Sequence, residues 1–428
     1  MTTIAWIAVA VFVTVYILIA TEWVHRVAAV LAGAAIMLVI GATDAEHAFF
    51  SEEAGIDWNV IMLLIGMMLI VAVLRRTGLF EYLAIWSVKR ARGRPYPVMV
   101  ILVVITAVAS AGLDNVTTVL LVAPVTLLVC DRLGLPAAPF LIAEVLASNI
   151  GGAATLIGDP PNIIIASKSG LTFNDFLIVM GPIVAILLVV FLGLCRWLFR
   201  RAFSSDSSRI AEVMSMHERD AIKDPRLLSI SLTVLGMVLT AFVLHSVLHL
   251  EPAVVAIVGG LILLALSRLN ADEVARDVEW HTLVFFAGLF IMVGALVNTG
   301  VIESLSRAAV EATEGRLWGT TLLLLWASAG LSAIVDNIPY VATISPIVGD
   351  LVQANGTPQG NVLWWSLALG ADLGGNATAI GASANVVMLG LAERAGRRIS
   401  FWEFTKYGGI VTVITIAICV PYLYLRFF

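Results

Sequence analysis

The sequence predicts an all-α integral membrane protein made of two inverted-topology repeats, with about 10 transmembrane helices, two re-entrant helical hairpins and two broken helices. Three features lead to this prediction: an apolar composition, an internal repeat, and an odd number of membrane crossings in each half. Of the 428 residues, 60% are hydrophobic and 13% are charged, and the mean hydropathy is +0.99. A soluble domain carries about 25% charged residues, so the composition excludes the soluble classes.

The second half of the chain echoes the first at an offset of 222 residues, which becomes 223 and finally 228. The clearest pairs are Ser110–Asn115 (SAGLDN) with Ser332–Asn337 (SAIVDN), Pro124 with Pro346, Asn149–Gly152 with Asp372–Gly375, and Phe173–Phe176 with Phe401–Phe404. An internal repeat determines the architecture of a chain. We therefore expect a first membrane repeat at 1–202, a cytoplasmic linker at 203–224 and a second, inverted membrane repeat at 225–428.

Long apolar stretches predict the membrane spans. Unbroken helices are expected near 4–23, 25–43, 58–74, 174–196, 227–246, 251–267, 280–298 and 404–426. Apolar stretches interrupted by Gly, Asp and Asn predict re-entrant hairpins at 96–130 and 318–350, and broken helices at 137–167 and 360–388. Each half then crosses the membrane an odd number of times, so the second half must run upside down relative to the first.

Basic residues gather on one side of this topology. With the Arg75–Arg94 segment inside, 21 of the 25 Lys and Arg lie on the inner side, as the positive-inside rule requires. The first apolar run has no basic segment before it and is long enough to span, so we expect it to be kept as the first helix. The prediction is a multi-pass protein of the cell (inner or plasma) membrane with both termini outside.

The stretch SNIGGAATLIGDPPN, Ser148–Asn162, breaks a helix at membrane depth. Broken backbone is tolerated there only where protein or water lines it, and the ends of half-helices supply polar groups to a solute. The breaks and the hairpin tips are therefore predicted to form a binding site near the midplane. The substrate-binding candidates are Asn115, Asn149, Gly151, Gly152, Thr155, Asn337, Gly374, Gly375, Asn376 and Thr378, with Asn162, Ser383 and Asn385 beside them.

Carboxylates at the same places are candidates for proton or cation coupling: Asp114, Asp336, Asp159 and Asp372. Carboxylates inside a membrane are costly and therefore usually functional. Helix capping is the alternative for Asp114 and Asp336 at the hairpin tips, and for Asp159 before two prolines. Asp372 stands where the other repeat has Asn149, at a point that needs no cap. Glu144, one turn before the first break, is a further titratable candidate or a solvated cavity residue.

Several other classes are disfavoured. The chain has no Walker A loop and no nucleophile–base constellation, which argues against a self-contained ATP-driven pump and against an enzyme. The three cysteines form no CxxC pair, so we expect no metal and no cofactor, and no nucleic-acid partner is expected. Between residues 95 and 167 and between 317 and 392, Arg132 is the only basic residue. The site is therefore expected to be acidic and to repel dianions and trianions.

The segment SNIGGAATLIGDPPNIIIAS, with the paired tips LDN and VDN, resembles the arsenite efflux pump and pink-eyed-dilution (P) protein branch of the ion transporter superfamily. The resemblance is clearest from Asp57 to Gly409 and implies inverted repeats, paired hairpins and a midplane site. Members of the arsenite branch export arsenite or antimonite, driven by the proton-motive force or by a soluble ATPase. The resemblance thus also implies a soluble arsenite-stimulated ATPase and a homodimer as partners within the lipid bilayer. The paired Ser-Asn-Thr motifs of related dicarboxylate and citrate carriers are absent.

Our first hypothesis is a secondary active transporter that exports arsenite or antimonite in exchange for protons by alternating access. A small inorganic solute such as neutral As(OH)3 suits an acidic pocket, because its hydroxyls can bond to amide, hydroxyl and carboxylate groups. A sodium/proton antiporter that uses the same carboxylates is the alternative. A carboxylate carrier is a weaker option, and a channel-like subunit gated by a cytoplasmic partner is the hypothesis from another class.

Overall fold

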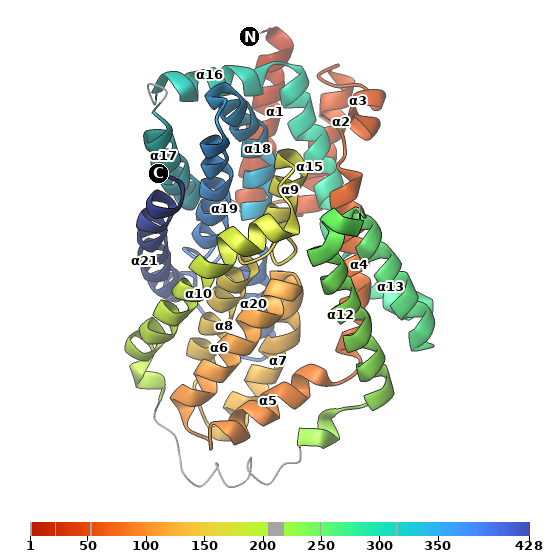
Figure 1. The fold of residues 1–428 in the computed structure, drawn as a ribbon, viewed down its shortest axis with the longest axis vertical. Helices are drawn as coiled ribbons and strands as arrows, with labels where there is room; N and C mark the ends of the chain where they lie inside the picture. Colours follow the sequence, from red (N-terminus) through yellow and green to blue (C-terminus); the bar gives the residue numbers. More distant parts are fainter. Residues whose placement is uncertain (1, 22, 52–53, 204–217, 249, 313–315) are drawn as a thin grey trace.

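The computed structural model describes residues 2–428 except 22, 52–53, 204–217, 249 and 313–315, and all the secondary structure in the described part is helical (Figure 1). The first half contains α1 (Thr3–Ala20), α2 (Arg26–Val39), α3 (Ala45–Phe50), α4 (Trp58–Arg75), α5 (Leu79–Arg90), α6 (Pro95–Gly112), α7 (Asn115–Leu133), α8 (Ala137–Gly152), α9 (Pro160–Ser169), α10 (Phe173–Leu198) and η1 (Arg200–Ala202). The second half contains η2 (Glu218–Ala221), α12 (Pro225–Leu248), α13 (Pro252–Ser267), α14 (Ala271–Arg276), α15 (Trp280–Asn298), α16 (Val301–Ala312), α17 (Leu317–Ser332), α18 (Asn337–Asn355), η3 (Pro358–Asn361), α19 (Val362–Gly374), α20 (Ser383–Arg394) and α21 (Phe401–Phe427).

The predicted all-α membrane fold is confirmed, and each predicted span is a helix. Seven described helices are long and apolar enough to cross a membrane, namely α4, α6, α7, α10, α12, α15 and α21. Five more apolar helices are shorter. Pro95, Pro225 and Pro252 each occupy the first position of a helix. Proline fits there because its fixed φ suits the helix and the first amide has no partner within the helix.

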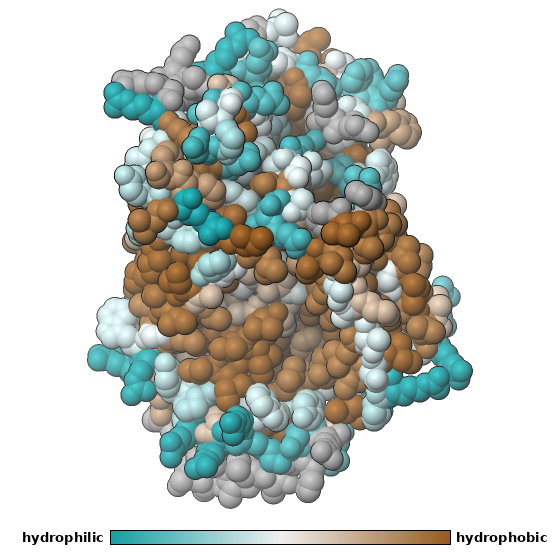
Figure 2. Space-filling model, viewed as in Figure 1, coloured by the Kyte–Doolittle hydropathy of each residue, from teal (hydrophilic) through white to brown (hydrophobic). Residues whose placement is uncertain are grey.

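A hydrophobic belt crosses the face of the molecule seen in Figure 2, between more hydrophilic ends. Large apolar side chains stay exposed on α1, α10, α12, α13 and α21, for example Ile178 at 60% and Val189 at 70% on α10. A water-soluble protein rarely exposes so continuous an apolar surface. The belt is therefore the surface that the lipid chains cover.

The two hairpins and the two broken helices form the same packing unit twice. The arms α6 and α7 are separated by Leu113 and Asp114, and the arms α17 and α18 by residues 333–336. In the first half the hairpin arm α6 packs along α8, and in the second half α17 packs along α19. The breaks fall between α8 and α9 and between α19 and α20, inside the predicted ranges.

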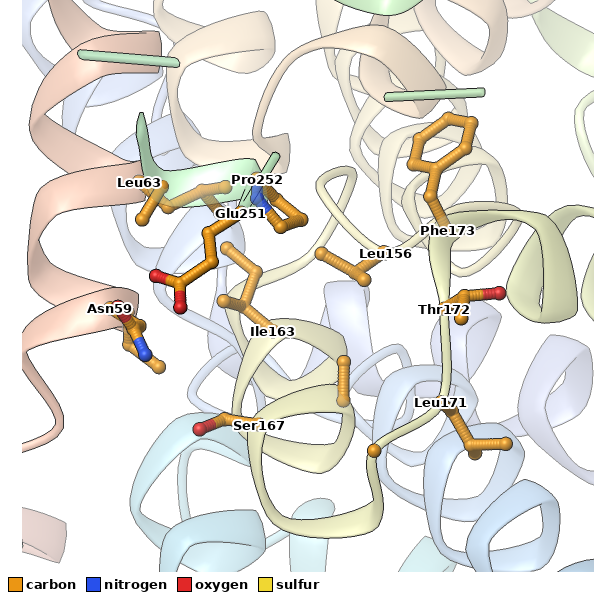
Figure 3. Close-up of a pocket in the computed structure, with 14 residues that line it drawn as sticks. Asn59, Leu63, Leu156, Ile163, Ser167, Leu171, Thr172, Phe173, Glu251 and Pro252 are labelled. Carbon is orange, nitrogen blue, oxygen red and sulfur yellow. The ribbon is translucent and has the colours of Figure 1, made fainter. Parts of the chain in front are cut away.

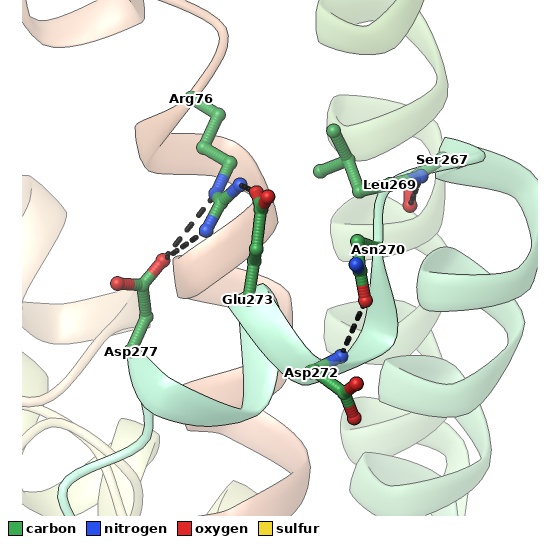
Figure 4. Close-up of polar contacts among 7 residues, drawn as sticks. All are labelled: Arg76, Ser267, Leu269, Asn270, Asp272, Glu273 and Asp277. Atoms are coloured by element: carbon green, nitrogen blue, oxygen red, sulfur yellow. Dashed lines mark hydrogen bonds and ion pairs between the residues drawn. The ribbon is translucent and has the colours of Figure 1, made fainter.

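The outer helices pack across the two halves. α2 packs on α15, and α13 packs on α4. The second predicted span of each half therefore lies against the third predicted span of the other half. Polar contacts fasten the ends of these pairs. Arg76 at the end of α4 donates to Glu273 at 2.7 Å and to Asp277 at 2.9 Å (Figure 4). At the end of α15, Asn298 Nδ2 donates to Thr43 Oγ1 at 3.2 Å.

Besides short helices such as α3 and α14, two longer helices in the described part of the chain were not predicted. α5 lies in the segment that the sequence analysis treated as a cytoplasmic loop, and α16 occupies the matching segment of the second half, at the opposite end of the molecule (Figure 1). Gly78 and Gly300 precede them with φ of +82° and +72°. Glycine enters this left-handed region with little strain, so each glycine ends one helix and begins the next. Both helices are shorter and more polar than a membrane span, so length and apolar composition did not predict them.

The predicted division of the chain into 1–202, 203–224 and 225–428 stays a prediction. Most of the predicted linker, residues 204–217, lies outside the described residues. Of its described part, η2 packs against α5, where Lys89 Nζ donates to Glu218 Oε2 at 2.5 Å.

Candidate binding and coupling site

The ends of the two broken helices and the tips of the two hairpins meet between the halves of the molecule. α9 packs on α18 and α19, and α20 packs on α7 and α8. Each helix that follows a break therefore contacts the hairpin and the broken helix of the other half. The candidate residues of both halves come together for this reason.

Asn149, at the end of α8, is the centre of a buried network of amides. Its Nδ2 donates to Asn376 Oδ1 at 2.9 Å and to Asn385 Oδ1 at 3.1 Å, both in the second half. Its Oδ1 accepts from Asn115 Nδ2 at 3.2 Å. Three of these four side chains are fully buried, and Asn115 is 3% exposed. Because a side-chain amide both donates and accepts, this network joins the two halves without any charge.

Asp159 connects the two hairpin tips. Its Oδ2 accepts from Asn115 Nδ2 at 2.9 Å and from Asn337 Nδ2 at 3.3 Å, and the side chain is fully buried. The carboxylate precedes α9 but makes no capping hydrogen bond. The capping alternative therefore does not hold for Asp159, and its contacts are with side chains of the candidate site.

Asp114 and Asp336 do cap the returning arms of the hairpins. Asp114 Oδ1 accepts from the Thr117 amide at 2.8 Å, and the Thr117 hydroxyl donates to the same carboxylate. Asp336 Oδ1 accepts from the Ile338 amide at 3.1 Å, and the Ser383 hydroxyl donates to its Oδ2. Capping accounts for both aspartates, so a coupling role for them stays a prediction.

Asp372, at the end of α19, lies in a different environment. It is fully buried, and neither carboxylate oxygen has a hydrogen-bond partner among the described residues. The side chain of Asn162 lies beside it. Asn162 Nδ2 donates to the Thr155 carbonyl at 3.1 Å, which leaves its Oδ1 without a donor in the described part of the chain. Three buried oxygen atoms of these two neighbouring side chains thus have no donor within hydrogen-bonding geometry in the described part of the chain.

The equivalent pair of the repeat, Asn149 with Asn385, explains why these oxygens lack a donor. There, Asn149 donates to Asn385 Oδ1, and Asn385 Nδ2 donates to the Thr378 carbonyl at 2.9 Å. Asp372 and Asn162 occupy the matching positions at the offset of 223. An ionised carboxylate cannot donate, so it cannot replace the Asn149 amide. A proton on Asp372 would restore the missing donor, and a cation between the oxygens would satisfy all three.

The glycines among the predicted site residues serve close packing. A Cβ on Gly151 would lie 2.2 Å from the Ala107 carbonyl oxygen, and a Cβ on Gly374 would lie 2.6 Å from the Ala329 oxygen. Both positions lie where a hairpin arm presses on a broken helix. Gly152 and Gly375 sit at similar backbone approaches within the breaks themselves.

The two predicted threonines fasten the breaks to the hairpins. Thr155 Oγ1 donates to the Ala111 carbonyl at 2.6 Å, and Thr378 Oγ1 donates to the Ala333 carbonyl at 2.5 Å. These equivalent bonds satisfy carbonyls at the ends of α6 and α17, which have no partner within their helices. The contacts of the glycines and threonines are thus structural, and substrate contact by them stays a prediction.

Replacing Gly151 with alanine is expected to destabilise the protein by about 3 kcal/mol, because the new methyl group overlaps the backbone of α6. Thermal unfolding of the purified protein in detergent measures the effect. Gly193→Ala in α10 is the matched control, since no atom lies within 4 Å of the position that its methyl group would take, and alanine favours a helix. Equal unfolding temperatures for the two variants would contradict the packing role.

One polar side chain beside the candidate site was not predicted. Arg26, at the start of α2, donates through Nη1 to Ser383 Oγ at 2.9 Å, and Ser383 in turn donates to Asp336. Its guanidinium also lies 5.7 Å from the centre of the Phe285 ring. The site that was expected to be acidic, because its own segments lack basic residues, therefore has an arginine from α2 beside it. Arg26 is 357 residues away from Ser383 in the chain, and only the packing of α2 on α15 brings it to the second hairpin.

Two cavities flank the buried centre. The first, of about 250 Å³, lies between the starts of α4, α10 and α13, and its polar lining includes Asn59, Ser167 and Glu251 (Figure 3). The second, of about 340 Å³, is lined by Arg26 and Asp336 among others. We call them the Glu251 cavity and the Arg26 cavity. They occupy matching places in the two halves, because α13 and α2 hold equivalent positions on α4 and α15. Their charges differ: the first is acidic where the second carries an arginine.

A multi-pass helical fold with helix breaks around a buried polar centre defines a membrane transporter. The chain belongs to the citrate transporter family, CitMHS, whose family model matches residues 16–370. The expected membership of the ion transporter superfamily is thereby confirmed, and the family is one of transporters, not of enzymes.

Individual relatives agree with this membership. A Mycobacterium tuberculosis protein described as an uncharacterized transporter is 55% identical over 423 residues, which are 99% of this chain and 98% of the relative. The 46 kDa membrane protein of Mycobacterium leprae is 55% identical over 422 residues, with 98% of each chain covered. The human P protein is 34% identical across 97% of this chain, which spans 59% of the length of that protein.

The fold is similar to that of a solved transporter. The crystal structure of the Alcanivorax borkumensis YdaH transporter aligns with a TM-score of 0.59 at 15% identity and covers 86% of this chain and 84% of its own. At this identity the likeness concerns the fold alone.

Proposed function

We propose that the protein is a secondary active transporter in which Asp372 binds a proton and couples its movement to the export of arsenite or antimonite. The observation that carries the proposal is the group of three buried oxygens on Asp372 and Asn162 that have no donor among the described residues. A buried carboxylate in this setting needs a proton or a cation to be stable. The fraction of protein with a proton or a cation bound at Asp372 therefore changes with the ion gradient, and coupled transport requires such a change.

The amide network supports a neutral polar solute. Asn115, Asn149 and Asn376 offer donors and acceptors close to one another, and Asp159 adds an acceptor. As(OH)3 has three hydroxyl groups that can donate to such oxygens and accept from such amides. A neutral solute also avoids the repulsion that carboxylates exert on an anion at low dielectric.

A sodium/proton antiporter is the alternative that the same observation supports. Three oxygens from a carboxylate and an amide are ligands of the kind that a hard cation prefers. In that case sodium and the proton compete for Asp372, and no second solute is needed.

A citrate or other carboxylate carrier is favoured by a separate observation, the Arg26 cavity. Its guanidinium and the Ser383 hydroxyl could both bond to a carboxylate, and the family is described as one of citrate transporters. We rank this function below the first because Asp336 lies in the same cavity and already accepts the hydrogen bond of the Ser383 hydroxyl.

Transport in proteoliposomes tests the three functions against each other. The purified protein is reconstituted, and uptake of arsenite, sodium and citrate is followed with and without a gradient of protons. Accumulation of arsenite that requires the proton gradient supports the first function. Sodium flux that collapses the proton gradient without arsenite supports the antiporter, and gradient-driven citrate accumulation supports the carboxylate carrier. Non-saturable flux that ignores the gradient would favour a channel.

Replacing Arg26 with glutamine separates anionic from neutral substrates. If an anion binds in the Arg26 cavity, the KM for citrate is expected to rise about tenfold, which corresponds to about 1.4 kcal/mol of lost binding. The KM for arsenite is expected to stay near the wild-type value. Arg26→Lys restores a charge, and Glu251→Gln in the Glu251 cavity is the matched control. An arsenite KM that rises as much as the citrate KM would contradict a neutral substrate.

Orientation and partners belong to the same proposal. We expect both termini outside, a cytoplasmic linker at 203–224 and a location in the plasma membrane. A homodimer and a soluble arsenite-stimulated ATPase are expected partners. Accessibility of single cysteines introduced in α5 and α16 tests the orientation, because these two helices lie at opposite ends of the molecule.

A further inference from the structure

Glu144 is a buried acid that the proposed coupling at Asp372 does not use. It lies in the middle of α8 with 3% of its surface exposed. Its Oε1 accepts from the Thr126 hydroxyl of α7. Its Oε2 is buried and has no hydrogen-bond partner among the described residues. A carboxylate in this position lacks the bonds that would stabilise a negative charge.

The second half of the molecule shows that the fold does not need this acid. At the offsets of 222 and 223, Val348 of α18 and Leu367 of α19 take the places of Thr126 and Glu144. Both are fully buried apolar side chains. The same pair of helices is therefore packed once with valine and leucine and once with threonine and glutamate. A buried polar pair costs stability relative to apolar packing, so a role other than stability must explain the presence of the threonine and the glutamate.

The position of Glu144 lies on the way to the buried centre. It is seven residues after the start of α8 and five residues before Asn149. At 1.5 Å per residue these separations are about 10 Å and about 7.5 Å along the helix. The acid thus stands between one end of α8 and the amide network.

Other titratable groups lie on the helices that pack against α8, and they are mostly at helix ends. α6 carries Tyr96 near its start and no charged residue. The groups on the other neighbours are Cys130, Asp131 and Arg132 of α7, Asp175, Cys195 and Arg196 of α10, Asp372 of α19, Glu393 and Arg394 of α20, and Glu403, Lys406, Tyr407, Cys419, Tyr422, Tyr424 and Arg426 of α21. Of these, the buried Cys130 thiol is close enough to interact with the Glu144 carboxyl.

We propose that Glu144 is a second proton-binding site of the transporter. In the conformation described here the carboxyl holds a proton on Oε2, and Oε1 accepts from Thr126. When the path from the end of α8 opens, the proton passes from Oε2 to water, and Thr126 stabilises the carboxylate that is left. The role in transport depends on the proposed proton coupling at Asp372, but the protonated state of Glu144 can be measured without any transport.

Infrared difference spectroscopy of the purified protein measures that state directly. The wild type is expected to show a band of a protonated carboxyl group that is lost as the pH is raised and that is missing in Glu144→Gln. Thr126→Val keeps the acid and is expected to keep the band, shifted by the loss of the hydroxyl contact. A wild-type spectrum that matches the spectrum of Glu144→Gln at every pH would overturn the proposal.

The double variant Glu144→Leu with Thr126→Val transfers the apolar pair of the second half into the first. It is expected to fold, because the second half already packs this pair in equivalent helices. Inside-out vesicles with an imposed gradient of about one pH unit and no membrane potential then report arsenite accumulation at steady state. Loss of one coupled proton lowers the limiting accumulation ratio by about tenfold.

The outcomes separate this inference from the proposed function. A tenfold lower ratio in the double variant and in Glu144→Gln supports a second proton, and an unchanged ratio overturns it. If the wild type itself does not accumulate arsenite, the proposed substrate fails while the infrared result still decides whether Glu144 binds a proton. If the double variant does not fold, the accumulation ratio of Glu144→Gln alone is compared with that of the wild type.

Discussion

The variant Asp372→Asn is expected to fold at least as stably as the wild type and to lose ion-coupled transport. An asparagine at this position reproduces the equivalent pair of the repeat, in which Asn149 Nδ2 donates to Asn385 Oδ1 at 3.1 Å. Its amide can donate to Asn162 Oδ1, and the buried carboxylate without partners disappears. We expect the free energy of unfolding to rise by about 1–3 kcal/mol. Solute accumulation against its gradient is expected to vanish, since the amide cannot bind and release a proton.

Two measurements check this prediction on the same preparation. Thermal unfolding in detergent gives the change in stability, and uptake into vesicles with and without a proton gradient gives the coupling. Asn149→Asp is the mirror control. It places a carboxylate against Asn376 Oδ1 and Asn385 Oδ1, which then lose their donor, and is expected to destabilise the protein by about 3–5 kcal/mol. A clearly destabilised Asp372→Asn would argue that the carboxylate is structural.

The variant Asp159→Ala is expected to cause a large loss of stability at the buried centre. It removes one of the two acceptors of Asn115 Nδ2, at 2.9 Å, and the acceptor of Asn337 Nδ2, at 3.3 Å. Leaving buried donors unpaired costs about 1–3 kcal/mol for each, so we expect a total loss of about 2–5 kcal/mol. The two hairpin tips then lose their common contact.

Asp159→Asn is the matched control, because it keeps the size of the side chain and one acceptor oxygen. It is expected to lose less stability than Asp159→Ala, by about 1 kcal/mol or more. Unfolding temperatures in detergent compare the two variants with the wild type. If Asp159→Ala unfolds at the wild-type temperature, Asp159 does not hold the hairpin tips together.

Particular residues show how far sequence reasoning reached at the site. The helix breaks, the paired tips and the position of Asp372 at a break could all be predicted, because glycine, proline and carboxylates are unusual in an apolar stretch. The functional role of Asp372 stays a prediction. The sequence could not show that Asp159 bonds to Asn115 and Asn337 instead of capping α9. A capping residue and a network residue look alike in sequence, and only the packing of α9 against α18 distinguishes them.

Arg26 shows a second limit. Between residues 95 and 167 and between 317 and 392, which hold the hairpins and the broken helices, Arg132 is the only basic residue. The arginine that reaches Ser383 comes from α2 in the other half. The sequence carries a weak signal for it, a lone basic residue at the start of an apolar helix, but nothing that names its partner.

The sequence by itself determined the helical membrane class, the repeat, the spans and the positions of the breaks. These follow from local rules: apolar length sets a span, and glycine, proline and polar residues end a helix wherever they occur. Tertiary structure alone decided that helices of one half pack against helices of the other and that Arg26 is linked to Asp336 through Ser383. It also decided that Asp372 and Asn162 lack a donor among the described residues. These contacts depend on distances between segments far apart in the chain, and no local pattern of residues encodes such distances.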